Sequence, residues 1–136
     1  VADKADETNI VQLPNKDWLL NARVQNAGNR KIFISKDQGK TWESKMEEQL
    51  IDPTCNASTL MLGKDILFSN LHDSKDRKNL GLKMSKDQGK TWNFVKTIDP
   101  NDTAYSVLTN ISKKKIGILY EAGDYEDIVF ESIELK

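Results

Sequence analysis

The octapeptide SKDQGKTW occupies residues 35–42 and recurs, letter for letter, at residues 85–92. The similarity extends into the flanks, because "RKIFISKDQGKTWES" aligns with "NLGLKMSKDQGKTWNF". Each copy follows a hydrophobic, strand-like run and ends on a Trp that resumes an apolar pattern. An internal repeat at this interval is typical of solenoids, propellers and arrays. The repeated unit is therefore predicted to be a strand, a turn and a second strand.

The polar residues within each octapeptide have the chemistry of a tight turn. Asp37 and Gly39 lie in the first copy, and Asp87 and Gly89 hold the same places in the second. An Asp side chain accepts hydrogen bonds from backbone amides close to it in the chain, and Gly tolerates a positive φ angle. Both copies are predicted to be the turns of β-hairpins.

The rest of the chain repeats the pattern of short β-rich runs between polar or Gly/Pro/Asn turns. These runs are "NIVQL", "DWLLNARV", "STLMLGKDILFSN", "YSVLTNI", "KKIGILYEA" and "DIVFESIEL". Continuous apolar stretches such as "ILF" and "IGILY" favour strands covered on both faces. The most polar loop is "LHDSKDRKN", and Lys113 to Lys115 are expected at a hairpin tip. The sequence predicts an all-β protein made of roughly four-stranded units.

Composition excludes several classes of partner. The chain has 136 residues, the size of one domain, and a net charge of -1 with 30% charged residues, which indicates no nucleic-acid surface. No apolar run approaches the roughly 20 residues of a membrane helix, so membrane insertion is not expected. Cys55 is the single cysteine and cannot form an internal disulfide, so a buried small hydrophobe is expected there.

The pattern Ser-x-Asp-x-Gly-x-Thr-Trp resembles the Asp box, a repeat of sialidases and several other β-propeller proteins. The resemblance implies an all-β, six-bladed β-propeller with each box at the turn between the outer strands of a blade, remote from the active site. The alternative is that Asp37 or Asp87 is a catalytic acid or a metal ligand. A carboxylate that satisfies the amides of a tight turn favours the architectural interpretation.

A more specific resemblance runs from about Glu7 to the C-terminus. In order and spacing, "DETNIVQL…LLNARV", "LFSNLHDSKDRKNLGL" and "TAYSVLTNI…IGILYEAG" resemble the second half of a bacterial sialidase catalytic domain. This implies an exo-sialidase, a glycoside hydrolase that releases terminal sialic acid from glycoconjugates with retention of configuration. It also implies a secreted or cell-surface protein that needs no cofactor. Residues 1–136 would be the C-terminal part of one propeller domain.

The resemblance assigns four site residues. Arg23 and Arg77 match two members of an arginine triad that holds the substrate carboxylate, which suits the guanidinium fork. Tyr105 matches the catalytic nucleophile, and Glu7 matches the base that activates it. Tyrosine nucleophiles in sialidases are an exception to the two-carboxylate scheme. A phenol with a pKa of about 10 needs such a base at neutral pH. The alternatives are surface arginines, a core tyrosine and an exposed glutamate.

Other candidate site residues have weaker support from the sequence. Glu121 in "LYEAG" matches the carboxylate that braces the first triad arginine, the alternative being a surface glutamate at a strand end. His72, the only histidine, lies in a polar loop without a catalytic partner nearby in the sequence. Asp124, Glu126 and Asp127 are expected to be a solvated turn and not a calcium site, and no metal site or phosphate loop is predicted.

Two elements of the sialidase pattern have no match, namely the first triad arginine and the acid/base Asp. The chain opens on "VADKADETNI", without Met or a leader pattern. Six blades of about 50 residues need roughly 300, so this chain would supply about two and a half blades. We expect it to pair with a missing N-terminal half and to be inactive alone. The alternatives are a non-catalytic Asp-box binding module and another Asp-box glycosidase with paired carboxylates.

Overall fold

The computed structural model describes residues 5–135, and these fold into ten β-strands without a helix. None of this part of the chain therefore offers a helix that could cross a membrane. The strands are β1 (Ala5–Gln12), β2 (Trp18–Val24), β3 (Asn29–Ser35), β4 (Glu43–Ile51), β5 (Ser58–Leu62), β6 (Asp65–Leu71), β7 (Lys78–Ser85), β8 (Asn93–Ser112), β9 (Lys115–Ala122) and β10 (Asp127–Glu134). The all-β prediction is confirmed.

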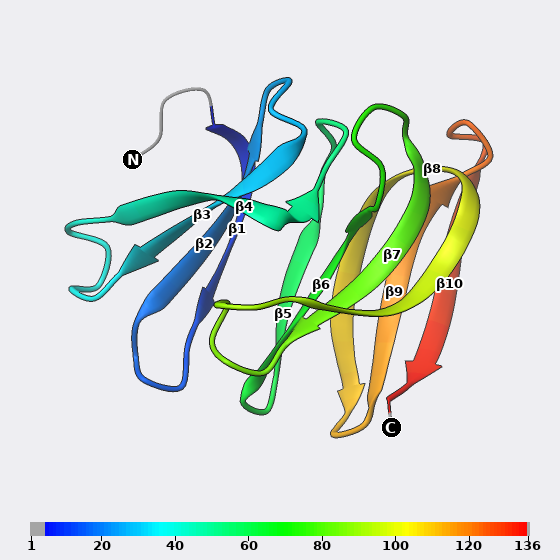
Figure 1. The fold of residues 1–136 in the computed structure, drawn as a ribbon. Coiled ribbons are helices and arrows are strands. Elements are labelled where there is room, and N and C mark those ends of the chain that lie inside the picture. Colours follow the sequence, from blue (N-terminus) through cyan, green and yellow to red (C-terminus); the bar gives the residue numbers. More distant parts are fainter. Residues whose placement is uncertain (1–4, 136) are drawn as a thin grey trace.

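Within each of two sheets, every strand pairs antiparallel with the next strand in the sequence (Figure 1). Strands β1–β4 form one four-stranded sheet, and β5–β10 form a second sheet of six strands. Strand β8 pairs with β7 through residues 93–102 and with β9 through residues 103–112. Pro100, which cannot donate to a ladder, lies near this change of partner. The long strand therefore serves two successive blades.

Three blade-like units follow from this pairing. Blade 1 is β1–β4, blade 2 is β5–β7 with residues 93–102, and blade 3 is residues 103–112 with β9 and β10. Their strand numbers of four, four and three agree with the predicted two and a half blades. The predicted polar loop lies between β6 and β7, and the Lys-rich tip lies between β8 and β9.

Two hydrophobic cores hold the blades face to face. One core contains Leu19 and Ile32 of blade 1 with Phe68 and Trp92 of blade 2. The other contains Leu67 and Leu82 of blade 2 with Ile118 of blade 3. Cys55 belongs to the second core and is fully buried, as predicted, and burial raises the pKa of its thiol to about 11. Burial of apolar side chains between blades thus stabilises their packing against one another.

Polar groups also join the blades. The innermost strands are linked by the Thr59 amide, which donates to Asn9 Oδ1 over 3.1 Å, and by the Leu108 amide, which donates to Ser58 Oγ over 3.0 Å. Arg30, 1% exposed, donates to the Cys55 carbonyl over 2.8 Å and lies 3.4 Å from an Asp52 carboxylate oxygen. Burying a charged guanidinium is costly unless it is paired and hydrogen-bonded, so both partners are needed to stabilise Arg30 at this position.

Both repeated octapeptides form the predicted turns. In the first, the Thr41 amide and hydroxyl donate to Asp37 over 2.8 and 2.6 Å, and the Gly39 amide donates to Ser35 Oγ over 2.8 Å. The second has the same bonds, with distances of 2.9, 2.6 and 2.8 Å. The two carboxylates are occupied by turn amides and hydroxyls, which confirms their architectural place.

The outer face of blade 3 is not covered by any part of the chain that the structure describes. Its apolar side chains are Val107 (54% exposed), Leu119 (42%) and Phe130 (60%), which are neighbours across the three strands. The prediction that "IGILY" is covered on both faces is therefore wrong at Leu119. Alternate side chains of β9 point away from blade 2, and only the side facing blade 2 is packed.

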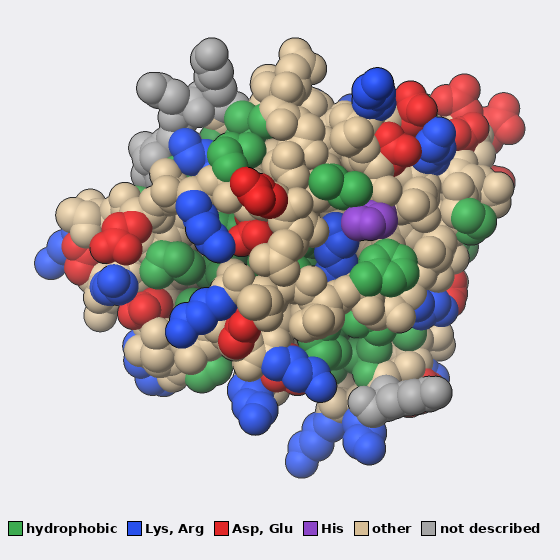
Figure 2. Space-filling view, in the orientation of Figure 1, with side chains coloured by type: hydrophobic (Ala, Val, Ile, Leu, Met, Phe, Trp, Pro, Cys, Tyr) green, Lys and Arg blue, Asp and Glu red, His purple; other side chains and the backbone are tan. Residues whose placement is uncertain are grey.

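Charge is mixed over the surface. On the face drawn in Figure 2, Lys and Arg side chains are interspersed with Asp and Glu, and hydrophobic side chains form separate patches. This distribution agrees with the near-zero net charge. On this face the blue side chains are most numerous along the lower edge, and the red ones at the upper right.

Candidate active site

Alternating strand directions bring all five predicted site residues to one end of the blades. Glu7 lies near the start of β1, Arg23 near the end of β2 and Tyr105 near the start of the blade 3 half of β8. Arg77 lies in the loop between β6 and β7, and Glu121 near the end of β9. That loop and the β9–β10 turn lie at the upper edge of Figure 1. The repeated octapeptides connect the opposite ends of the strands.

Three of the predicted residues are in direct contact. The Tyr105 hydroxyl donates to Glu7 Oε1 over 2.5 Å, and Arg23 Nη1 donates to Glu7 Oε2 over 2.8 Å. Arg23 Nη1 also lies 3.5 Å from the Tyr105 hydroxyl. The contact joins the inner strands of blades 1 and 3 and closes a small carboxylate, phenol and guanidinium cluster.

The Glu7 carboxylate changes the acidity of the Tyr105 phenol. The hydrogen bond to the Glu7 carboxylate, helped by burial, raises the pKa of Tyr105, while Arg23 acts in the opposite direction. The phenol therefore keeps its proton at neutral pH and shares it with a carboxylate that is already in place to accept it. A weak nucleophile within hydrogen-bonding distance of a base, with that base oriented by a third group, is the usual geometry for covalent catalysis.

Arg23 retains donors that the cluster does not use. Its side chain is 12% exposed and that of Glu7 is 32% exposed. The Nε of Arg23 is buried without a hydrogen-bond partner among residues 5–135, and both contacts of Arg23 in the cluster involve Nη1. Since a guanidinium carries five N–H donors, Arg23 can orient Glu7 and still bind another acceptor.

Arg77 is held by neutral groups on three sides. Its Nη1 donates to the Tyr125 hydroxyl over 2.6 Å, and its Nη2 donates to the Thr54 carbonyl over 3.4 Å. Its Cζ lies 6.0 Å from the centre of the Tyr105 ring. Arg77 thus lies beside the Glu7, Arg23 and Tyr105 cluster and faces the same phenol.

The three arginines of the chain differ in how their charge is balanced. Arg23 is paired with Glu7 at 2.8 Å, and Arg30 with Asp52 at 3.4 Å. Within the described residues, no carboxylate oxygen comes within 4.0 Å of Arg77. A partly buried guanidinium with only neutral partners is suited to an anion supplied from outside, and a planar carboxylate fits its fork.

Glu121 binds the backbone of Tyr105. Its Oε2 accepts a hydrogen bond from the Tyr105 backbone amide over 3.1 Å. The arginine that it is predicted to brace is not part of this chain, so that role stays a prediction. What the structure adds is that Glu121 fixes the backbone of the residue that carries the phenol.

The remaining sequence candidates do not join the site. His72 stacks near Phe94 with ring centres 5.4 Å apart, and burial lowers the pKa of the imidazole. The acidic residues of the β9–β10 turn are exposed. From residue 5 to residue 135, no three His, Cys, Asp or Glu side chains are grouped in a way that could hold a metal ion.

Two contacts of the site were not predicted from sequence. Tyr125 was not singled out within the acidic turn "GDYED", and Thr54 was not considered at all. Both residues have positive φ angles, 72° for Tyr125 and 62° for Thr54, which is unusual for a bulky or β-branched side chain. A Gly-Asp pair before Tyr125 was the available signal for left-handed backbone in that turn.

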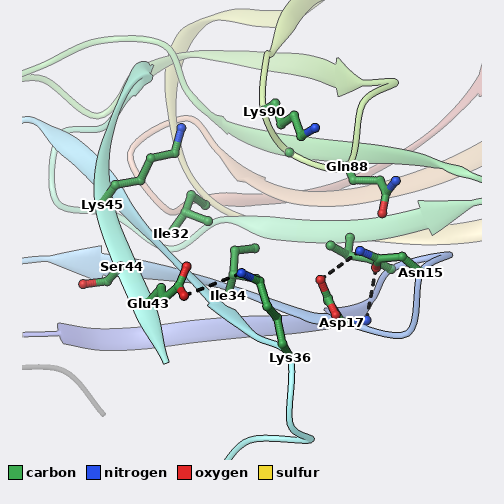
Figure 3. A pocket seen from close by; sticks show the side chains of 12 residues that line it. Asn15, Asp17, Ile32, Ile34, Lys36, Glu43, Ser44, Lys45, Gln88 and Lys90 are labelled. Atoms are coloured by element: carbon green, nitrogen blue, oxygen red, sulfur yellow. Dashed lines mark hydrogen bonds and ion pairs between the residues drawn. The ribbon is translucent and has the colours of Figure 1, made fainter. Parts of the chain in front are cut away.

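A groove between blades 1 and 2, with a volume of about 480 Å³, lies away from this cluster (Figure 3). Its floor includes Leu13, Ile32 and Ile34, and its rim includes Gln88 and Gly89 of the second octapeptide. Charged groups on the rim pair locally, as in the 3.6 Å contact of Lys36 with Glu43. The groove is a seam between blade edges at the octapeptide end and not a candidate for the chemistry.

Comparison with known proteins places the chain in a family. The family model described as "BNR repeat-like domain" matches residues 3–118. A curated sialidase of Bacteroides fragilis (strain YCH46) is 34% identical over 96% of this chain, and a sialidase of Micromonospora viridifaciens is 34% identical over 87%. The match covers 26% and 20% of those two proteins, so the chain spans about a quarter or less of their length.

Solved structures give the same likeness. The Hadza microbial sialidase Hz136 superposes with a TM-score of 0.87 and 29% identity, over 97% of this chain and 28% of that one. The agreement covers nearly every described strand. The partial β-propeller expected from the octapeptides is confirmed by this likeness.

Proposed function

Because the chain belongs to the BNR repeat-like domain family, we propose that it is part of the catalytic domain of a sialidase-type glycoside hydrolase. The observation that carries the proposal is the contact of Tyr105, Glu7 and Arg23, three residues from two blades. The sialidase names of its relatives support the same reaction class. A non-catalytic propeller module would have no use for a phenol hydrogen-bonded to a partly exposed ion pair.

In the proposed reaction, Arg77 and the free donors of Arg23 bind the carboxylate of a terminal sialic acid. Glu7 takes the phenol proton as Tyr105 Oη attacks the anomeric carbon and the glycosidic oxygen departs. Water then cleaves the tyrosyl-glycosyl bond, so that two inversions give net retention. A neutral phenol approaches this carbon more easily than a carboxylate nucleophile would, because the substrate carries its own negative charge there.

The reaction also needs a proton donor for the leaving group, and none is positioned in this cluster. We propose that further blades supply it, together with the first arginine of the triad. The exposed apolar face of blade 3 and the partial coverage of the relatives support this assembly. The chain joined by its complementing blades is called the complete propeller below.

Turnover of a fluorogenic sialoside tests the proposal. Tyr105→Phe in the complete propeller should reduce kcat at least about a thousandfold, because it removes the attacking oxygen and leaves the ring. Tyr120→Phe is the matched control. Tyr120 belongs to blade 3, as Tyr105 does; it lies on β9, and its ring is buried in the core between blades 2 and 3. Wild-type turnover by Tyr105→Phe would contradict the nucleophile assignment. Rapid turnover by the present chain alone would contradict the need for further blades.

A further inference from the structure

The β9–β10 turn, residues 123–126, contains three successive residues with positive φ. The angles are 60° at Gly123, 56° at Asp124 and 72° at Tyr125. Glycine adopts this backbone without strain, whereas a tyrosine does so at a cost and only where its surroundings hold it. Such strain is concentrated at functional positions, and here it places a phenol beside Arg77.

Tyr125 is not held there by burial. The residue is 55% exposed, and the one hydrogen bond of its side chain to residues 5–135 is the short contact with Arg77 Nη1, 2.6 Å long. The turn is anchored behind it by the Gly123 amide, which donates to the Asp102 carbonyl over 3.1 Å. The backbone therefore orients the phenol, and the phenol is positioned to hold the guanidinium.

Packing alone would leave Arg77 free to turn. A cavity of about 380 Å³ lies between Arg77 and the turn, lined also by Asp102, Thr103, Ala104 and Asp124. A guanidinium that rotated toward either aspartate would become paired and lose its affinity for an external anion. The Tyr125 hydroxyl is uncharged, so it fixes the orientation of Arg77 without neutralising it.

The remaining hydrogens of Arg77 suit a carboxylate. Each terminal nitrogen carries two N–H groups. Nη1 gives one to Tyr125, and Nη2 gives one to the Thr54 carbonyl. One N–H on each nitrogen is left for an external acceptor, and a carboxylate has two oxygens that can receive them.

We propose that Tyr125 is a positioning residue that holds Arg77 in the orientation for binding the substrate carboxylate. The inference deepens the proposed function and rests on it. Tyr125 does not touch the reacting atoms, so its loss should weaken substrate binding and leave the chemical step unchanged.

The first test is the effect of Tyr125→Phe on KM and kcat for the fluorogenic sialoside, measured in the complete propeller. We expect KM to rise about fivefold, the effect of one lost hydrogen bond, with kcat within about twofold of wild type. In an Arg77→Lys background, which lacks the fork, Tyr125→Phe should change KM no further. Tyr120→Phe is the control, because the side-chain partners of Arg77 among residues 5–135 are Tyr125, Thr54 and the Tyr105 ring, and not Tyr120.

A second variant separates positioning from stability. Tyr125→Gly removes the phenol and also relieves the positive φ, so its Tm should equal or exceed that of wild type while KM rises as in Tyr125→Phe. A purely structural role for Tyr125 predicts the reverse, a lower Tm with unchanged KM. That result would overturn the proposal.

The outcomes also separate this inference from the proposed function. Suppose that Arg77→Lys raises KM but Tyr125→Phe leaves it unchanged. The positioning role of Tyr125 is then wrong, and the assignment of Arg77 to the carboxylate site is retained. If Arg77→Lys and Tyr105→Phe both behave as wild type, the proposed function fails, and the inference about Tyr125 fails with it.

Discussion

The two octapeptides have identical sequences and nearly identical turns, yet they lie in different surroundings. Asp37 and Asp87 accept the same hydrogen bonds from the Thr amide and hydroxyl, with corresponding distances within 0.1 Å of one another, and Asp87 also accepts one from the Lys90 amide over 3.1 Å. Trp92, in contrast, is 6% exposed and packs against blade 1, whereas Trp42 is only half-buried.

The cause of the difference is the neighbouring blade. Trp92 of blade 2 belongs to the same buried core as Leu19 and Ile32 of blade 1. The equivalent direction from blade 1 has no neighbour among residues 5–135, so Trp42 stays at an open edge and donates its indole N–H to the Gly39 carbonyl over 3.0 Å. Eight residues therefore determine their own turn, but they do not determine the packing of their last side chain.

The largest expected effect is on the tryptophans. In the chain, Trp92→Ala should lower the free energy of unfolding by about 3 to 5 kcal/mol, and Trp42→Ala by about half of that or less, because its ring is only partly buried. Urea denaturation of the two variants measures both. Equal losses would mean that blade 1 contributes nothing to the stability of the second octapeptide. In the complete propeller, the two losses should become similar.

A smaller difference is expected between the glycines. Gly39 and Gly89 have φ angles of 87° and 85°, so alanine is strained at both. A Cβ at Gly39 would lie 3.0 Å from the Trp18 ring, whereas one at Gly89 would lie 2.5 Å from Leu19 Cδ1, in the packed core between blades. Gly89→Ala should therefore cost about 1 kcal/mol more than Gly39→Ala in the same measurement. The opposite order would show that the core yields readily.

The aspartates should differ least. Asp37→Ala and Asp87→Ala each remove the acceptor of the same turn amides, so their Tm values should fall by the same few degrees in thermal unfolding. Ser35→Ala and Ser85→Ala, which remove the hydroxyl that caps the glycine amide, form a second matched pair. Unequal losses for the aspartates would mean that the turn depends on the adjoining blade.

Acid unfolding examines the same point by pH. Hydrogen bonds from Thr41 and Thr91 lower the pKa of Asp37 and Asp87 to about 2, from an ordinary value of 3.8. A lowered pKa in the folded state stabilises the fold above about pH 4, and this stability is lost as the pH falls toward 2. Asp37→Asn and Asp87→Asn should each reduce that loss equally. Identical acid sensitivity in wild type and variants would contradict the assignment.

Much of the fold could be predicted because its turns are local. Asp37, Gly39 and their repeated copies carry the turn chemistry within a few residues, and two copies imply successive blades. A weaker repeat was available as well. The tripeptide Ile-Asp-Pro occurs at 51–53 and 98–100, and both copies lie where the chain passes from one blade to the next.

The rest depends on contacts that no local pattern encodes. Leu119 has the sequence environment of a covered strand, yet it is exposed because no strand among residues 5–135 packs on that face of blade 3. The hydrogen bond between Arg77 and Tyr125 joins a loop of blade 2 to a turn of blade 3, and the two residues are 48 positions apart in the sequence. Glu7 and Tyr105 could be paired only through the sialidase resemblance, since nothing near either residue in the chain indicates the other.

The hydrogen bond between Tyr105 and Glu7 joins residues 98 positions apart. Contacts of such high sequence separation are slow to form, because the entropy of closing a long loop opposes them until the intervening structure is in place. The bond joins blade 1 to blade 3 across blade 2, so we expect it to form only after the three blades have docked. Glu7 and Tyr105 would thus meet late in folding, and the raised pKa that this contact gives the Tyr105 phenol would be among the last properties of the fold to be established.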